Sequence, residues 1–143
     1  MTGASNGATP SLHEILQPEG WPKPKGYANG VAATGRMVYT GGLVGWDTQG
    51  RFRESFADQL RQTLDNTLAV LSEGGAGPEH IVRMTWYITD VENYLADPKA
   101  VGAAWRDTIG RHYPAMAVVQ VVRLVETAAK VEIETTAVVP LEG

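Results

Sequence analysis

The chain of 143 residues contains no cysteine. Disulfides, thiol nucleophiles and cysteine-ligated zinc sites are therefore excluded. Its 12 lysines and arginines form no run and are outnumbered by 16 acidic residues, which gives a net charge of −4. A protein that grips a phosphate backbone needs a basic patch, so this composition argues against a nucleic-acid partner.

Long apolar runs are also missing. No stretch approaches the ~20 apolar residues that a membrane span needs. No basic N-terminal segment precedes an apolar one, so we expect no export signal, no membrane partner and a cytoplasmic location. The three histidines, His13, His80 and His112, are far apart in the sequence and fit no metal-ligand spacing. We therefore expect no metal and no other cofactor.

What is present is an ordinary globular composition, 43% hydrophobic and 20% charged, which at this length predicts one domain. Residues 1–10 are small and polar. Residues 17–30 hold three prolines and three glycines, which is typical of an extended, turning segment. We expect a flexible or extended segment over residues 1–25, with Trp21 packed down as an anchor, and a single domain over residues 26–143.

The sequence marks both the start and the end of two helices. The first begins after Ser55 as N-cap, with Asp58 three residues on as a variant of the capping box, and ends at Gly74-Gly75. The second begins after Asp97, with Pro98 at its first position, and ends at Gly110. Each carries an apolar stripe at helical spacing, formed by Phe56, Leu60, Leu64, Leu68 and Leu71 in the first and by Val101, Ala104, Trp105 and Ile109 in the second.

Strands are predicted at residues 31–34, 37–44, 82–89, 117–124 and 130–139. Strands interrupted by two helices favour an α+β, two-layer fold in which one mixed sheet carries both helices on one face. The strand from Met116 to Leu124 is largely apolar on both faces, whereas a sheet with one solvated face alternates. We therefore expect an oligomer that buries the second face.

Several short motifs occur in a specific order and spacing. They are Gly26-Tyr27-Ala28-Asn29-Gly30, Tyr39-Thr40-Gly41-Gly42, Gln59-x-x-Gln62-x-x-x-Asn66, and Pro114 followed by Val131-Glu132-Ile133-Glu134. Over about residues 26–139 this pattern resembles the RidA family, also called YjgF or L-PSP-like. The resemblance implies a chorismate-mutase-like (ferredoxin-like) subunit, a homotrimer around a central barrel, and three inter-subunit clefts that bind a small molecule.

The resemblance also implies roles for single residues. In the deaminating members a glutamate handles the water that attacks an imine carbon, the backbone near a glycine holds the substrate, and a tyrosine lines the cleft. These positions correspond to Glu132, Gly42 and Tyr27. Met116 stands where those enzymes have an arginine that clamps the substrate carboxylate, and Val118 stands where they often have cysteine.

The methionine changes the expected pocket. A guanidinium offers a permanent charge and two parallel donors to a carboxylate, and a thioether offers neither. Losing such a contact in a desolvated cleft costs on the order of 2–5 kcal/mol. We expect a more apolar pocket around Met116, suited to an aromatic or bulky apolar body. Trp46, in the loop after the glycine pair, is the tryptophan expected to line a pocket, while Trp86 and Trp105 are expected in the core.

Each candidate has a purely structural alternative. Glu132 and Glu134 share a strand face by parity and form either a proton-handling group or an ordinary solvated pair. Tyr27 forms either a cleft wall or a rim aromatic. The Gly41-Gly42 pair indicates either a close approach of the backbone by a ligand or another strand, or a β-bulge.

Three functions follow from these residues. The first is a hydrolytic deaminase of an imine or enamine metabolite with a non-standard, apolar pocket. The second is a non-catalytic trimer that binds a small ligand or regulates another protein. The third, an endoribonuclease activity linked to some family members, is disfavoured by the acidic balance, the absence of a basic patch and the absence of a neighbouring histidine pair.

Overall fold

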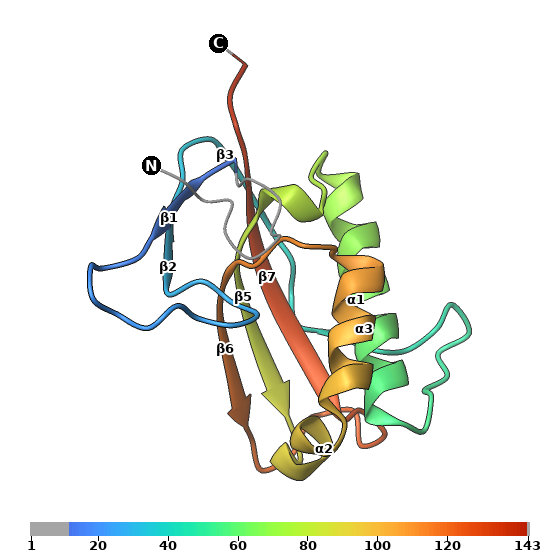
Figure 1. Ribbon diagram of the computed structural model, residues 1–143. Helices are drawn as coiled ribbons and strands as arrows, with labels where there is room; N and C mark the ends of the chain where they lie inside the picture. Colours follow the sequence, from blue (N-terminus) through green and yellow to red (C-terminus); the bar gives the residue numbers. More distant parts are fainter. Residues whose placement is uncertain (1–11, 143) are drawn as a thin grey trace.

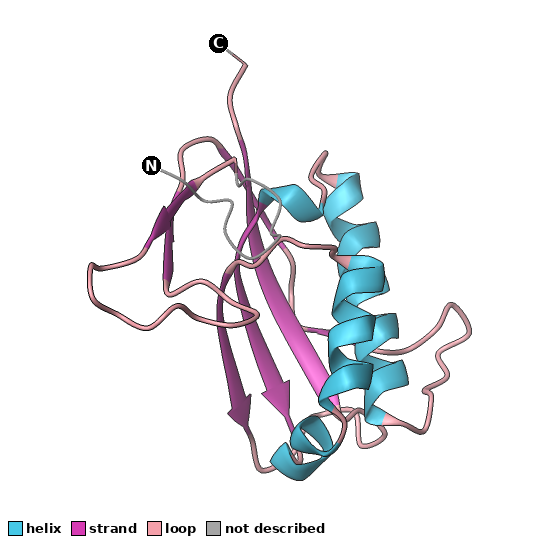
Figure 2. Ribbon diagram, viewed as in Figure 1, coloured by secondary structure: helices cyan, strands magenta, loops and turns pink. Residues whose placement is uncertain are grey.

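Two long helices lie side by side on one face of a sheet, so that the molecule has two layers (Figure 1; Figure 2). The computed structural model describes residues 12–142. Within them the main sheet has five strands: β3 (Arg36–Tyr39), β7 (Val131–Val139), β5 (Ile81–Ile88) and β6 (Ala115–Gln120) in spatial order, with β4 (Leu43–Val44) also paired to β7. The helices of the second layer are α1 (Phe56–Glu73) and α3 (Pro98–Thr108). The predicted α+β, two-layer architecture is confirmed.

The strand order explains why the helices share one face. β5 pairs antiparallel with β7 but parallel with β6. A parallel pair needs a crossover connection, and the chain makes it with the short helix α2 (Val91–Ala96) and α3. This crossover sets α3 beside α1 above the sheet (Figure 1). α2 was not predicted from the sequence.

The N-terminal strands differ from the prediction. β2 (Gly30–Ala32) does not join the main sheet, but pairs antiparallel with β1 (Glu14–Leu16), which was not expected. The segment between them lies at the surface, and Trp21 within it is 58% exposed rather than packed down. The polar segment 1–10 falls outside the described residues.

Two predicted strands are shorter than expected. The one over residues 37–44 is divided into β3 and β4. At the break the Thr40 amide still donates to the Thr135 carbonyl (2.9 Å), and the Thr40 hydroxyl donates to the Gly41 carbonyl (2.7 Å) and accepts from the Thr135 amide (3.1 Å). The one over residues 117–124 begins at Ala115 and ends at Gln120, and Val122 beyond it is 99% exposed.

Both predicted helix starts are confirmed. The Ser55 hydroxyl accepts a hydrogen bond from the Asp58 amide (3.1 Å), and the Asp97 carboxylate accepts one from the Ala100 amide (3.1 Å). These caps satisfy backbone donors that have no partner inside the helix. α1 ends at Gly74, and the following Gly75 takes a φ of +76°, which is accessible to glycine at little cost.

The core lies between the helices and the sheet. Its fully buried side chains include Leu60, Leu64 and Leu71 from α1, Met84, Trp86 and Ile88 from β5, and Val131, Ile133 and Ala137 from β7. A shift of register between Ile81 and Arg83 rotates the start of β5, so Ile81 is buried in place of the expected Val82. After that bulge the strand alternates as the sequence predicts.

One buried polar side chain ties three segments together. Gln59 on α1 is 1% exposed. Its Nε2 donates to the carbonyls of Arg53 (2.8 Å) and Ala128 (2.9 Å), and its Oε1 accepts from the Lys130 amide (2.8 Å). The amide group therefore fastens the segment before α1 and the link before β7 to the helix.

We predict that Gln59→Leu lowers the free energy of unfolding by about 2–4 kcal/mol, because leucine has a similar volume but leaves backbone groups without partners in a dry site. Chemical denaturation measures this. Gln62→Leu, one turn further along α1, serves as the control and should cost no more than about 1 kcal/mol, since among the described residues the Gln62 side chain bonds only Asn66. Equal losses in the two variants would contradict the role of Gln59.

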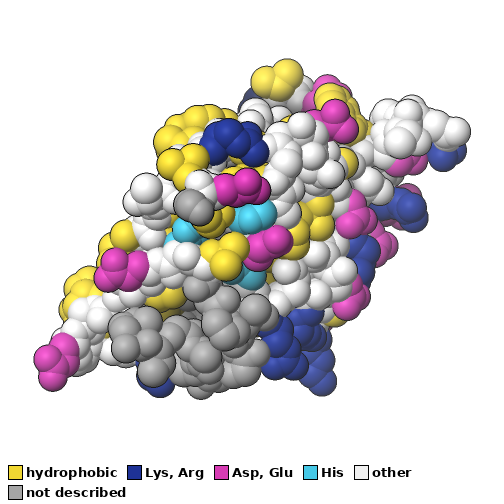
Figure 3. All heavy atoms as spheres, turned by 90° about the horizontal axis from the view of Figure 1, so that it is seen from above, with side chains coloured by type: hydrophobic (Ala, Val, Ile, Leu, Met, Phe, Trp, Pro, Cys, Tyr) yellow, Lys and Arg dark blue, Asp and Glu magenta, His cyan; other side chains and the backbone are white. Residues whose placement is uncertain are grey.

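The three histidines, distant in the sequence, gather at one end of the molecule, as the view from above shows (Figure 3). His112 is buried, and its Nε2 donates to the Ile81 carbonyl at 2.6 Å. Burial lowers the pKa of His112 below its ordinary 6.5, and the charges of His13 and His80 act in the same direction. Within residues 12–142 no group of histidines and carboxylates is placed to hold a metal ion.

This lowered pKa predicts acid sensitivity. Above pH 6.5 His112 is neutral in the folded and the unfolded protein. Below pH 6.5 the unfolded chain binds a proton at His112 that the folded protein does not bind. Stability should therefore fall as the pH drops below 6.5. His112→Gln, which keeps a donor for Ile81, should flatten the dependence of melting temperature on pH between 7 and 5. An unchanged slope in His112→Gln would contradict this account.

None of the helices in residues 12–142 combines the length and apolar character that a bilayer crossing requires.

Candidate functional site

The candidate residues fall into two groups on opposite faces of the sheet. Met116 and Val118 on β6 pair with Met84 and Trp86 on β5, whose side chains are buried under the helices. Glu132 on β7 pairs with Tyr87, which points the other way. One group therefore lies on the helix side of the sheet, and the other lies on its open face.

The group on the open face is a carboxylate cluster made of Gly42, Tyr87, Glu132 and Glu134. The Tyr87 hydroxyl donates to Glu134 Oε1 at 2.6 Å. This hydrogen bond, then burial and the charges of Glu134 and Glu132, raise the pKa of Tyr87. The phenol therefore stays protonated and holds Glu134, while the carboxylate of half-buried Glu132 makes no hydrogen bond or ion pair to any described residue.

Gly42 lies directly against the free carboxylate. It precedes β4, whose Val44 pairs with Glu132. A Cβ atom on Gly42 would overlap the carboxyl oxygen of Glu132, whereas one on Gly41 would meet nothing within 4 Å. The glycine at 42 is thus needed for the close approach of the backbone to Glu132, which favours that reading of the glycine pair.

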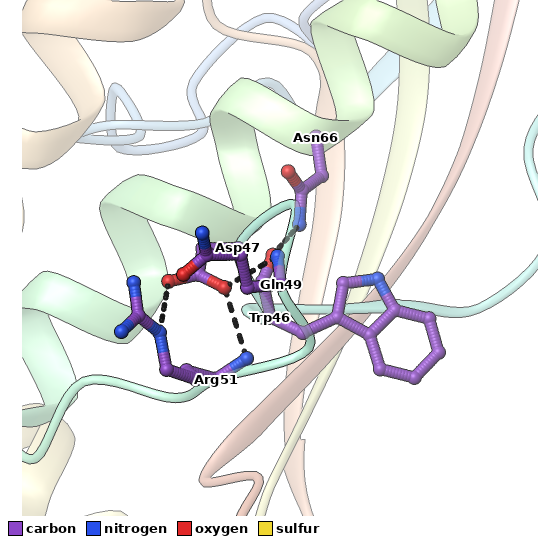
Figure 4. Close-up of polar contacts among 5 residues, drawn as sticks. All are labelled: Trp46, Asp47, Gln49, Arg51 and Asn66. Carbon is purple, nitrogen blue, oxygen red and sulfur yellow. Dashed lines mark hydrogen bonds and ion pairs between the residues drawn. The ribbon is translucent and has the colours of Figure 1, made fainter.

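The turn that follows β4 is fixed by polar contacts (Figure 4). Asn66 on α1 donates from Nδ2 to the carbonyls of Val44 (3.0 Å) and Trp46 (2.8 Å). Asp47 Oδ1 accepts from the amides of Gln49 (2.8 Å) and Arg51 (2.9 Å), and these bonds lower the pKa of the Asp47 carboxyl. The anchored turn holds β4, and with it Gly42, in place beside Glu132.

The group on the helix side lines a cavity of about 530 Å³ between β5, β6, α2, α3 and residues 25–27. Five aromatic side chains form much of its wall: Tyr27, Trp86, Tyr94, Trp105 and Tyr113. The Trp105 and Tyr113 rings stack at 6.4 Å with planes 13° apart, and Trp86 meets Tyr94 edge to face at 6.2 Å. We call this the aromatic cavity. Its volume lies in the range of about 300–1,000 Å³ of small-molecule sites.

The predicted site residues divide between these two places. Tyr27, Met116 and Val118 line the aromatic cavity, and Gly42 and Glu132 meet on the open face. Trp46 belongs to neither, because it is 45% exposed on the loop after β4 and packs on Phe52. Trp86 and Trp105 are buried as expected, and they also line the cavity.

Sequence reasoning missed several residues of these groups, among them Tyr87, Tyr94, Lys25 and Arg106. Tyr94 lies on α2, whose start is marked by the side chain of Asp90 accepting from the Glu92 amide (2.9 Å). An Asx N-cap before Val91 was therefore a usable signal. Arg106 had no such signal, since only the folded position of α3 brings it to a cavity that residues of β5, β6 and 25–27 also line.

Comparison with known proteins is consistent along most of the chain. A family model described as Endoribonuclease L-PSP matches residues 22–139. A RutC family protein of Synechocystis is 30% identical over 130 residues, covering 89% of this chain and 97% of that protein. A protein named 2-iminobutanoate/2-iminopropanoate deaminase, from Salmonella typhimurium, is 33% identical over 116 residues, covering 78% and 86%.

Solved structures agree with the sequence relatives. The Rid family protein YyfB from Yersinia pestis superposes with a TM-score of 0.77 at 25% identity, covering 89% of this chain and 98% of that one. Escherichia coli TdcF with bound serine superposes with a TM-score of 0.65 at 30% identity, covering 88% and 98%. The chain belongs to the RidA (YjgF, L-PSP) family.

The close approach at Gly42 generates a prediction. Alanine at this position should push the Glu132 carboxyl into another rotamer, at a stability cost below about 1 kcal/mol because the overlapping group is the end of a flexible side chain. A crystal structure and thermal unfolding of Gly42→Ala measure both effects. Gly41→Ala is the control and should leave Glu132 in place. An unmoved carboxylate in Gly42→Ala would contradict the contact.

Proposed function

We propose that this chain is a hydrolytic deaminase of an imine or enamine that carries an apolar body, and that Glu132 handles the attacking water. The observation that supports this most is the state of Glu132: a half-buried carboxylate, free of protein partners, seated against bare backbone at Gly42. Its neighbour Glu134 is engaged by Tyr87. The name of the Salmonella relative, a deaminase of small 2-imino acids, supports the reaction class.

The proposed reaction requires one carboxylate that transfers protons. Water attacks the carbon of the C=N bond while a carboxylate accepts one of its protons, and that proton is then delivered to the nitrogen. The resulting carbinolamine passes its hydroxyl proton through the same carboxylate to the nitrogen, the C–N bond breaks, ammonia leaves and a carbonyl remains. An enamine first takes a proton at carbon to become the imine. Glu132 serves as the base and then the acid, and the Gly42 backbone borders the reacting atoms.

The two groups come together in the proposed homotrimer. The sheet separates them within one subunit, so a substrate that uses both must lie between subunits. The open face of the sheet supports such an assembly, because Met37 on β3 is 53% exposed, Tyr39 is 62% exposed and Val119 on β6 is 42% exposed. Three such faces packed around a barrel bury this apolar surface. Each cleft then joins the carboxylate cluster of one subunit to the aromatic cavity of its neighbour.

A second function is favoured by one observation. The aromatic cavity is lined by no aspartate or glutamate, so it is suited to hold a ligand without any chemistry. A non-catalytic trimer that binds a small apolar ligand would use the cavity alone. This alternative predicts that ligand binding stabilises the protein and that Glu132 is dispensable.

The endoribonuclease activity in the family description finds no support here. The histidines that gather at one end are engaged with backbone: His13 contacts the Val138 carbonyl, His112 the Ile81 carbonyl, and His80 Nδ1 accepts from the Gly77 amide. RNA cleavage by acid–base catalysis needs ring nitrogens that reach the substrate.

Imine hydrolysis tests the proposal directly. An amino-acid oxidase generates 2-imino acids from small to aromatic, and semicarbazide trapping follows their decay with and without the protein. We predict faster decay, strongest for imines with aromatic side chains, and a loss of about 100-fold or more in Glu132→Ala, the range for removing a general acid–base group.

The control variant is Glu126→Ala, which removes an exposed carboxylate from the link before β7 and should keep full activity. Size-exclusion chromatography with light scattering checks that Glu132→Ala retains the wild-type assembly. If no imine is turned over and a ligand still stabilises Glu132→Ala, the deaminase proposal is contradicted and the non-catalytic binding function is supported.

A further inference from the structure

The charged side chains that line the aromatic cavity are all basic. Lys25 and Arg106 contribute to the wall, and no carboxylate does, although the chain as a whole carries a net charge of −4. We infer that the cavity binds an aromatic carboxylate, with its ring between the tryptophan and tyrosine side chains and its carboxylate on the Arg106 guanidinium. In taking this ligand to be the substrate, the inference rests on the proposed function.

Arg106 is free to accept an anion. It forms no ion pair or hydrogen bond with the described part of the chain, while the next residue, Asp107, is paired with Arg61 at 2.8 Å. The nearest acid on the same helix is therefore already neutralised by α1. A guanidinium without a partner, beside a cavity, offers two parallel donors in the geometry that a carboxylate accepts.

Gly102 leaves room beside the Arg106 guanidinium. A Cβ atom on Gly102 would come within 3.0 Å of Arg106 Nη1, and both residues line the cavity. Side chains on a helix lean towards its N-terminus, so Arg106 folds back over the bare backbone one turn earlier. Glycine in the middle of a helix is unfavourable, and here it leaves room for the guanidinium at the cavity wall.

The aromatic wall selects the other end of the ligand. Trp86 meets both Trp105 (6.0 Å) and Tyr94 (6.2 Å), and Tyr113 stacks on Trp105. Offset and edge-to-face arrangements of this kind are the ones in which a further aromatic ring packs well. A ligand of three or four carbons would leave most of the 530 Å³ unfilled, so a small acid lacks the contacts that a ring would make.

Aromatic walls alone also suit a quaternary ammonium group, which binds ring faces by cation–π attraction. The two cationic side chains at the wall oppose such a ligand. Met116 carries no charge, so Arg106 and Lys25 determine which sign of charge the cavity favours in its ligand. Arg106 thereby supplies, from helix α3, the carboxylate contact that a strand residue at position 116 does not make here.

Four unreactive ligands separate these contributions in isothermal titration calorimetry of the full chain. They are 3-phenylpropanoate, propanoate, 3-phenylpropan-1-ol and phenyltrimethylammonium. We expect 3-phenylpropanoate to bind at least tenfold more tightly than the other three. Arg106→Gln should weaken 3-phenylpropanoate at least tenfold and leave 3-phenylpropan-1-ol unchanged, and Arg106→Lys should restore part of the loss.

Lys99→Gln is the matched control, since it removes a cation from the same helix but from outside the cavity wall. Gly102→Ala should weaken 3-phenylpropanoate less than Arg106→Gln does, because its methyl group would meet Arg106 Nη1 at 3.0 Å and shift the flexible guanidinium by only a few tenths of an ångström. Equal affinity for the acid and the alcohol, a preference for the ammonium ligand, or no effect of Arg106→Gln would each overturn the inference.

Failure of this inference can be told apart from failure of the deaminase. The four ligands do not react, so their binding reports on the cavity without any turnover at Glu132. Selective binding of 3-phenylpropanoate without imine turnover would contradict the proposed deaminase activity and support the aromatic-acid site. If the protein hydrolyses aromatic imines and Arg106→Gln does not alter the rate, the deaminase activity is supported and the role of Arg106 is contradicted.

Discussion

The parallel pairing of β5 with β6 is the constraint on which the rest of the subunit depends. Two parallel neighbours cannot be joined by a tight turn, so the chain must cross over the sheet between Ile88 and Ala115. The crossover contains α2 and α3 and sets α3 beside α1 on one face of the sheet, whose outer strand in the described chain is β6. The aromatic cavity is the space bounded by this crossover and by β6, and it exists because the connection has to be long.

The alternation of side chains along β5, β6 and β7 then decides what one subunit can do. Residues opposite each other on neighbouring strands share a face, so Met116 belongs with Met84 under the helices and Glu132 belongs with Tyr87 on the open face. A sheet is one backbone thick, and a small substrate cannot reach both faces at one point. If Glu132 acts on a ligand held in the cavity, that ligand must lie between two copies of the chain, and catalysis depends on assembly.

The sequence predicted elements whose causes are local. α1 and α3 begin where Ser55 and Asp97 cap them, and β5 and β7 follow from alternation over eight or more residues. The pairing of β1 with β2, the break between β3 and β4, and α2 were missed, because elements of two to six residues owe their stability to tertiary contacts. In the site, Glu132 and Gly42 came from motif resemblance. Arg106 could not be identified from the sequence, because an exposed arginine on a helix becomes a candidate site residue only when the fold places it beside a cavity.

Placing the carboxylate contact on α3 instead of β6 changes what the pocket can discriminate. An arginine on β6 would lie among buried side chains, where a charged hydrogen bond is strong enough to hold a small acid by itself. Arg106 is exposed at the wall, where water competes for the guanidinium and an ion pair contributes less. Binding must then draw the remainder of its free energy from ring contacts with Trp86, Trp105 and Tyr113. Selectivity for a ligand that has both an acid and a ring follows, because neither part suffices alone.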